Sequence, residues 1–147
     1  NILFDDKTGE SICVIDLDTI MPGFSLYDFG DSIRFGANTT REDDDNLDNV
    51  TVSLELFESY TKGFLSACAK ALTQAEVDNL AFSAKLMTYE CGIRFLTDYL
   101  LGDPYFYCAY PEHNRDRTRN QIALAKDIGT KQAEMKQIIN ACLKEYR

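Results

Sequence analysis

Oxygen-bearing side chains stand at the ends of two expected strands near the start of the chain. Asn1 opens the apolar run 2–4, and Asp16 lies near the end of the β-branched run 12–17. If the two runs pair as a hairpin, side chains at adjacent strand ends could share a hard cation such as Mg²⁺. Asp and Asn also end many strands because they favour turns. The spacing alone therefore leaves a metal site and a simple turn both open.

A second aspartate competes for the same role. Asp28-Phe29-Gly30 repeats the tripeptide whose aspartate holds magnesium against the ATP phosphates in protein kinases. Here it falls in a short helix that we expect over about residues 27–35. An aspartate near a helix start also serves as an N-cap, so the tripeptide alone does not choose between Asp28 and Asp16.

The elements around these residues predict an α+β fold that is mostly helical, with one β-hairpin on a helical body. The sequence DDKTGE between the two apolar runs has the Asp and Gly of a hairpin loop. Pro22-Gly23 predicts a loop, and 37–49 is a polar, acidic loop. A last helical stretch is expected over about residues 114–146, with a bend or break at Gly129.

The best-marked helix lies in the second half of the chain. Thr73 and Glu76 have capping-box spacing, and Gly102 suits the position after the helix end. The segment LMTYECGIRFL within this helix is apolar nearly all round. A helix of that kind is usually buried on every side, and we expect it in the middle of the domain.

Composition restricts the function classes. The chain has 147 residues, 45% hydrophobic, with a net charge of -9. This predicts one folded domain and argues against nucleic acid or an anionic membrane as partner. No run of 18 apolar residues occurs, and no signal peptide is visible. The five cysteines are odd in number and lack C-x-x-C spacing, as expected for reduced thiols of a cytoplasmic protein.

The segments NILFDDKTGESICVIDLDTIMPG and YDFGD together resemble the C-lobe of the aminoglycoside phosphotransferase and choline kinase superfamily. That superfamily has a catalytic loop H-x-D-x-x-x-x-N, a hairpin, an "ID" with the metal aspartate, and a "YD" that starts a helix. CVIDLDTIMPGFSLYDFGDSIRFGANT and ECGIRFLTDYLLGDPYF are most similar to the N-acetylhexosamine 1-kinases. The resemblance runs over nearly the whole chain.

The resemblance implies a division of roles near the hairpin. Asn1 matches the last Asn of the catalytic loop and Asp16 matches the Asp of "ID", both magnesium ligands. Asp28 matches the "YD" aspartate, so its Phe-Gly neighbours would be coincidental and a helix N-cap its expected role. Asp18 would lie on the side of Asp16 if the strand continues, where it could touch a second metal or a sugar hydroxyl, or start a turn. The aspartate that serves as catalytic base would precede Asn1.

The resemblance also implies a sugar site. Arg94 in "IRFL" and Tyr105 in "GDPYF" match sugar contacts of the subgroup, and Phe35 is a weaker candidate for stacking. An arginine fork suits sugar oxygens, and an aromatic face suits the apolar face of a pyranose. The alternatives are structural. Arg94, if buried, would need a partner such as Glu90 one turn earlier, and Tyr105 could simply pack on the core.

Other polar groups favour structural roles. The acidic run 41–48 is expected to be a solvated loop, and His113 a surface or cap residue near the last helix. Arg115, Arg117 and Arg119 are expected on the exposed first turns of that helix, although they could reach a phosphate or an acidic loop.

These features together predict the C-lobe of a phosphotransferase, comprising residues 1–147 as one domain. With ATP and Mg²⁺, a longer protein containing it would phosphorylate the anomeric hydroxyl of N-acetylglucosamine or N-acetylgalactosamine. Because the chain begins without Met inside an apolar run and the base is absent, we expect a fragment that is inactive alone. The alternatives are another acceptor (an aminoglycoside, choline or homoserine) or a non-catalytic kinase-like binding domain.

Overall fold

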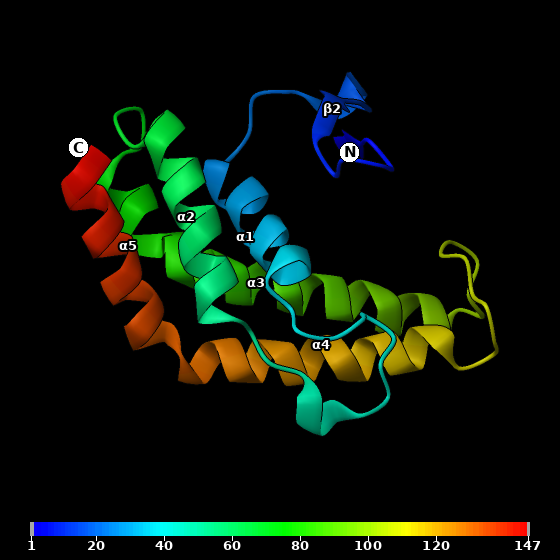
Figure 1. The fold of residues 1–147 in the computed structure, drawn as a ribbon. Helices are drawn as coiled ribbons and strands as arrows, with labels where there is room; N and C mark the ends of the chain where they lie inside the picture. The colour runs from blue at the N-terminus through cyan, green and yellow to red at the C-terminus, as the bar shows by residue number, and fades with distance from the viewer. Residues whose placement is uncertain (1, 147) are drawn as a thin grey trace.

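The chain folds as a mostly helical α+β structure. The computed structural model describes residues 2–146, with only the backbone of Thr19. Its elements, in chain order, are β1 (Ile2–Phe4), β2 (Ser11–Val14), the 3-10 turn η1 (Leu17–Thr19), α1 (Ser25–Gly36), the 3-10 turn η2 (Leu47–Asn49), α2 (Leu54–Cys68), α3 (Gln74–Leu100), α4 (His113–Thr130) and α5 (Gln132–Tyr146). The long helices α3 and α4 run side by side, and α1 packs against α3 (Figure 1). α2 packs against α5, which also contacts α3.

The tripeptide Asp28-Phe29-Gly30 lies inside α1, where two of its residues serve packing. Phe29 is fully buried in the hydrophobic core, and its ring packs edge to face on that of Phe57, with the two ring centres 5.9 Å apart. Gly30 faces α3 so closely that a Cβ there would lie 2.5 Å from the carbonyl oxygen of Ser83. The missing side chain lets the two helix backbones approach each other. The expected helix over residues 27–35 is therefore confirmed, and its glycine sets the distance between α1 and α3.

Local signals define both ends of α3 as expected. Thr73 and Glu76 form the complete capping box, in which each side chain accepts from the other residue's backbone N–H. Gly102 follows the C-cap residue Leu101 with φ of +88°, a left-handed conformation that favours glycine. The burial expected for this helix is wrong, however. Only one side is buried, and the side with Leu86, Tyr89 and Ile93 is exposed.

The last helical stretch breaks into α4 and α5 one residue after Thr130, close to the break expected at Gly129. Lys131 lies at the break and donates to Asp127 Oδ2 at 2.8 Å and to the carbonyl of Val52 at 3.0 Å. The Asp127 carboxylate also accepts from the Val52 backbone N–H at 2.8 Å. These bonds fasten the segment before α2 to the corner between α4 and α5.

The hairpin stands apart from the helices. β1 and β2 pair antiparallel, Ile2 with Val14 and Leu3 with Cys13, and the strand residues are exposed on both faces. The segment that follows β2 joins the hairpin to α1 (Figure 1). The hairpin is confirmed, but the expectation that it packs on the helical body is wrong for residues 2–146, because two-sided exposure leaves both faces without a covering layer.

None of the helices within residues 2–146 has the length and apolar character needed to cross a membrane.

Gly30 provides the first test of this packing. Gly30→Ala should lower the free energy of unfolding by about 3 kcal/mol, because the new methyl group meets backbone atoms that cannot move aside. Gly63→Ala is the matched control, since a Cβ at that position of α2 meets nothing within 4 Å. It should stabilise the protein by about 0.5–1 kcal/mol. Urea unfolding followed by circular dichroism measures both; equal effects would show that the α1–α3 contact is not tight.

Candidate functional site

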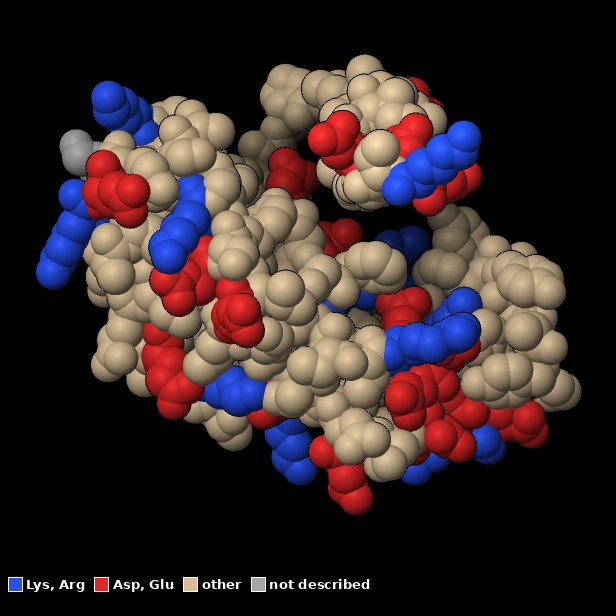
Figure 2. Space-filling model, viewed as in Figure 1, with Lys and Arg blue, Asp and Glu red and all other residues tan. Residues whose placement is uncertain are grey.

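A cavity of about 540 Å³ opens between α1, α3 and the loop that precedes α4. Figure 2 shows this side of the molecule hollowed beneath the hairpin, with acidic and basic side chains in the hollow. Aromatic and aliphatic side chains complete the cavity wall. The lining residues are Tyr27, Asp28, Asp31, Arg34, Glu42, Met87, Glu90, Cys91, Arg94, Phe95, Phe106, Tyr107 and Arg117.

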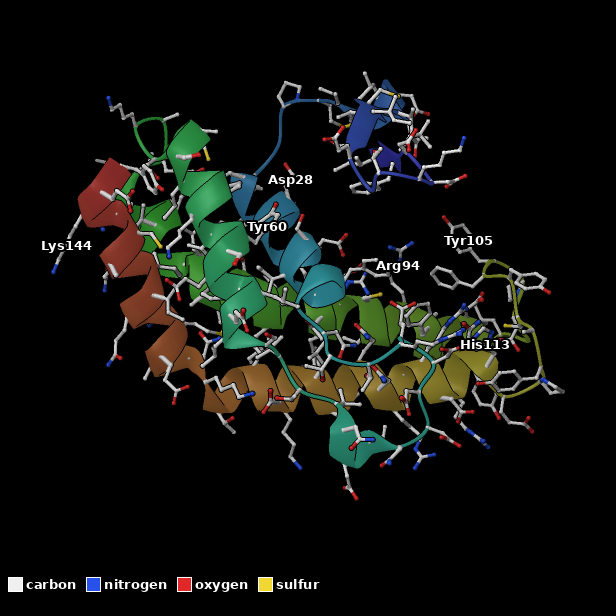
Figure 3. All side chains as sticks on the ribbon, in the orientation of Figure 1. Asp28, Tyr60, Arg94, Tyr105, His113 and Lys144 are labelled. Atoms are coloured by element: carbon white, nitrogen blue, oxygen red, sulfur yellow. The ribbon has the colours of Figure 1, made fainter. Side chains whose placement is uncertain are left out.

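Arg94 lines this cavity and also a second one, of about 450 Å³, which it shares with Tyr105 and Phe106. The guanidinium carbon of Arg94 is 5.9 Å from the centre of the Tyr105 ring and 5.4 Å from that of Phe106, within the range of cation–π attraction (Figure 3). Arg94 is half-exposed, and its Nε is 3.8 Å from Glu90 Oε1. The premise that Arg94 is buried is therefore wrong. An exposed pair at this distance contributes little to stability, so the guanidinium remains available to a ligand.

Asp98, on the last turn of α3, holds the loop that carries Tyr105. Its buried carboxylate accepts from the backbone N–H groups of Tyr105 and Phe106 at 3.0 and 2.9 Å, and from Asn114 Nδ2 at 2.9 Å. Asn114 also donates to Asp103 Oδ1 at 2.9 Å, which ties the loop to the start of α4. A buried carboxylate is costly unless hydrogen-bonded, so these bonds fix the position of Tyr105. Sequence reasoning missed Asp98; its place just before Gly102 was the available signal.

A chain of charged groups forms another part of the cavity wall. Arg34 donates to Glu42 at 2.5 Å and to Asp31 at 2.7 Å, and Arg117 Nε is 3.9 Å from the other oxygen of Glu42. Burial lowers the pKa of Arg34, but the hydrogen bond to Asp31 and the neighbouring negative charges outweigh it, so the pKa is raised. Arg34 therefore stays charged in the cavity.

Arg117 turns inward, contrary to the expectation that it lies on an exposed helix turn. Its Nη1 donates to the Tyr107 carbonyl and to Asn114 Oδ1, both at 3.1 Å, and its guanidinium carbon is 5.3 Å from the Phe95 ring centre. Arg115 and Arg119 are exposed as expected. Arg117 thus reaches the acidic loop through Glu42, which was the alternative considered for this basic group.

The acidic loop is anchored rather than fully solvated, contrary to expectation. Asn120 of α4 donates to the carbonyl oxygens of Arg41 and Asp44 at 3.0 and 3.3 Å. His113 is the first residue of α4 but is buried, not a surface group: its Nδ1 accepts from the Ala109 N–H at 3.1 Å, and its Nε2 lies 3.3 Å from Asp43 Oδ2. These contacts hold Glu42 at the cavity.

Phe35 does not join Arg94 and Tyr105. It is exposed and lines an adjoining cavity of about 400 Å³, which shares Arg34, Glu42 and Arg117 with the first. Stacking of one sugar ring on both Phe35 and Tyr105 therefore has no support in this arrangement.

Cys91 lies in the cavity wall. Burial raises the pKa of its thiol to about 11. Because the thiolate is the nucleophilic form, a raised pKa disfavours a nucleophilic role for this cysteine.

Asp28 is not the N-cap of α1. The N-cap residue is Phe24, without a side-chain cap, and Asp28 lies one turn later. Its exposed side chain lines the cavity at the end of α1 nearest the hairpin (Figure 3). The capping role expected for Asp28 is therefore wrong, and its carboxylate is free for a ligand or for a segment that covers this end of the cavity.

The candidate metal ligands lie at the hairpin. Asn1 falls outside the described residues. Asp16 follows β2 with φ of 62° and ψ of 54°, a left-handed conformation that is uncommon for residues other than glycine and is often found at functional sites. Asp18 lies in η1, so the strand does not continue through it as the same-side argument required. Both carboxylates are exposed.

The hairpin offers exposed carboxylates but no complete metal site among the described residues. Within residues 2–146, no three His, Cys, Asp or Glu side chains are grouped so as to hold a metal ion. Mg²⁺ is usually held by one or two carboxylates together with substrate phosphates. An exposed Asp16 carboxylate suits that partial role, which a phosphate ligand would have to complete.

No protein-family model matches this chain.

The hydrogen bonds from Tyr105 and Phe106 to Asp98, called the Asp98 clamp below, can be tested without knowing the ligand. Asp98→Asn keeps the shape but turns an N–H group toward backbone donors, and should cost about 2–4 kcal/mol of unfolding free energy. The amides of Tyr105 and Phe106 should exchange hydrogen at least about tenfold faster. Asp103→Asn is the control, because Asn tolerates the left-handed backbone of Asp103 (φ of 59°) and can still accept from Asn114. Unchanged exchange at 105–106 in Asp98→Asn would contradict the clamp.

Proposed function

We propose that this chain is the acceptor-binding lobe of a kinase-like phosphotransferase, the C-lobe of a longer protein. That protein would transfer the γ-phosphate of ATP to the anomeric hydroxyl of an N-acetylhexosamine. The observation that carries the proposal is the meeting of Arg94 and Tyr105 at the cavity of about 450 Å³. Both residues match sugar contacts in the resemblance to N-acetylhexosamine 1-kinases, and the close pairing of their side chains supports a shared ligand.

The chemistry of the first cavity, of about 540 Å³, suits a sugar as acceptor. Its lining holds three arginines, Arg34, Arg94 and Arg117, and four carboxylates, Asp28, Asp31, Glu42 and Glu90. Arginine forks donate to sugar oxygens and carboxylates accept from hydroxyl groups, while Phe106 offers an aromatic face. The carboxylates outnumber the arginines, and each arginine lies beside one of them, so the lining has no excess of positive charge. The donors and acceptors of this lining therefore suit a polyol, and the charges do not discriminate against a cationic acceptor.

Each group of the chain has a definite task in this proposal. Arg94 and Tyr105 orient the acceptor, and the Asp98 clamp keeps Tyr105 in place. Asp16, with Asn1 by resemblance, would hold Mg²⁺, which neutralises phosphate charge when bound. Positioning and charge stabilisation account for most of phosphoryl-transfer catalysis. The proton acceptor is expected to precede Asn1, so residues 1–147 alone should transfer no phosphate.

The experiment that tests the function uses the longer protein with ATP, Mg²⁺ and N-acetylglucosamine. Asp16→Asn should lower kcat by about 10²–10³-fold, the loss typical when a key charge-stabilising group is removed. Asp6→Asn, a charge-matched change at an exposed site in the hairpin loop, should leave kcat unchanged.

Two results would contradict the proposal. The first is an intact longer protein that phosphorylates no N-acetylhexosamine. The second is an active Asp16→Asn variant beside an inactive Asp28→Asn variant, which would move the metal to the tripeptide in α1.

A further inference from the structure

An apolar stripe runs along the exposed side of α3. It consists of Phe82, Leu86, Tyr89, Ile93, Leu96 and Leu100. These side chains are between 40 and 73% exposed. Their spacing alternates between four and three residues, the a and d pattern by which one helix packs on another. A row of six large apolar side chains on one helix is more than scattered surface hydrophobicity, and such rows mark interaction sites.

The stripe continues onto α4. A Cβ at Gly92 would lie 3.8 Å from Ile122 Cδ1, so the exposed Ile122 borders the stripe. Beyond Ile122, a shallow groove of about 650 Å³ adds the apolar side chains of Leu47, Val50 and Ala123, with polar and charged residues beside them. The apolar surface therefore spans both helices, which lie side by side in Figure 1.

Basic side chains follow one edge of this surface. Arg119 and Lys126 lie three residues before and four residues after Ile122, on the same face of α4, and both line the groove. Lys85 borders the same edge, because a Cβ at Gly129 of α4 would lie 3.2 Å from its Nζ. Arg119 Nη1 lies 3.9 Å from Asp116 Oδ1, and Asp127, which also lines the groove, pairs with Lys131, whereas Lys85 and Lys126 have no ion pair within residues 2–146. In a chain with a net charge of -9, this edge calls for a negatively charged partner.

The charges also argue against a second copy as that partner. In an antiparallel pair of α3 stripes related by a two-fold axis, the same edges of the two copies face each other. The basic edge of one copy, with Arg119, Lys126 and Lys85, would then lie along the basic edge of the other, and like charges brought together disfavour the pairing. The surface fits a different helix with an acidic edge.

We propose that the α3–α4 surface is the docking site for an amphipathic helix with an apolar seam and an acidic edge, belonging to the additional lobe of the same polypeptide. This inference rests on the proposed function, which needs that lobe to supply the catalytic base. The exposed faces of the hairpin fit the same source, since the base has to reach Asp16. Docking on α3 would fix the lobe to the body that carries Arg94.

The test uses two synthetic helical peptides about four heptads long, with Leu at a and d. One carries Glu along its edges and the other Lys. Calorimetry should show the Glu peptide binding residues 1–147 at least about tenfold more tightly than the Lys peptide. Ile93→Glu should weaken binding of the Glu peptide at least about tenfold. Leu56→Glu, at an exposed apolar site on α2, should leave that binding unchanged. The double charge reversal Arg119→Glu with Lys126→Glu should make the Lys peptide bind more tightly than the Glu peptide.

The longer protein identifies the source of the helix. There the site should already be occupied, so the Glu peptide should not bind, while Ile93→Glu should lower the melting temperature more than Leu56→Glu does. Binding of the peptide to the longer protein as tightly as to residues 1–147 would overturn the inference, even if that protein is an active kinase. So would equal affinity for the two peptides, no binding of either, or a dimer of residues 1–147 that Ile93→Glu dissociates.

Discussion

The close crossing of α1 and α3 at Gly30 determines most of what lies around it. A side chain at that position would meet the Ser83 carbonyl and the Met87 side chain, so the two helices keep this distance only because the residue is glycine. The crossing presents Asp28, Asp31 and Arg34 of α1 to the α3 residues of the cavity wall. The tripeptide 28–30 thus shapes the site by packing, through Phe29 and Gly30.

A second constraint is electrostatic. The buried Asp98 carboxylate satisfies two loop N–H groups and the Asn114 side chain, and it does so at the point where α3, the Tyr105 loop and α4 converge. Removing its charge would leave those donors without an acceptor. The packing at Gly30 shapes the α1 side of the first cavity. The hydrogen bonds of Asp98 hold the loop that brings Tyr105 to Arg94 in the second cavity, although a helix end separates these two residues.

Local signals in the sequence predicted local structure correctly. The capping box of Thr73 and Glu76 needs only neighbouring residues, and it defines the start of α3 as expected. Long-range contacts were not predictable in the same way. Arg94 was expected to be buried because its helix is apolar nearly all round, but one side of that helix is exposed. Asp28 was expected to cap α1, but α1 begins three residues earlier, at Ser25. Asp98 was missed because its partners lie up to 16 residues away. The meeting of Arg94 with Tyr105 was anticipated only through a family resemblance.

The central claim is that Arg94 and Tyr105 form one sugar-binding site. The most direct measurement is a nuclear magnetic resonance titration of isotope-labelled residues 1–147 with N-acetylglucosamine. The claim predicts saturable shifts of the Arg94 Nε–H signal and of the Tyr105 and Phe106 amides. Saturating shifts confined to the groove beside Ile122, or no change at Arg94 at any sugar concentration, would contradict it.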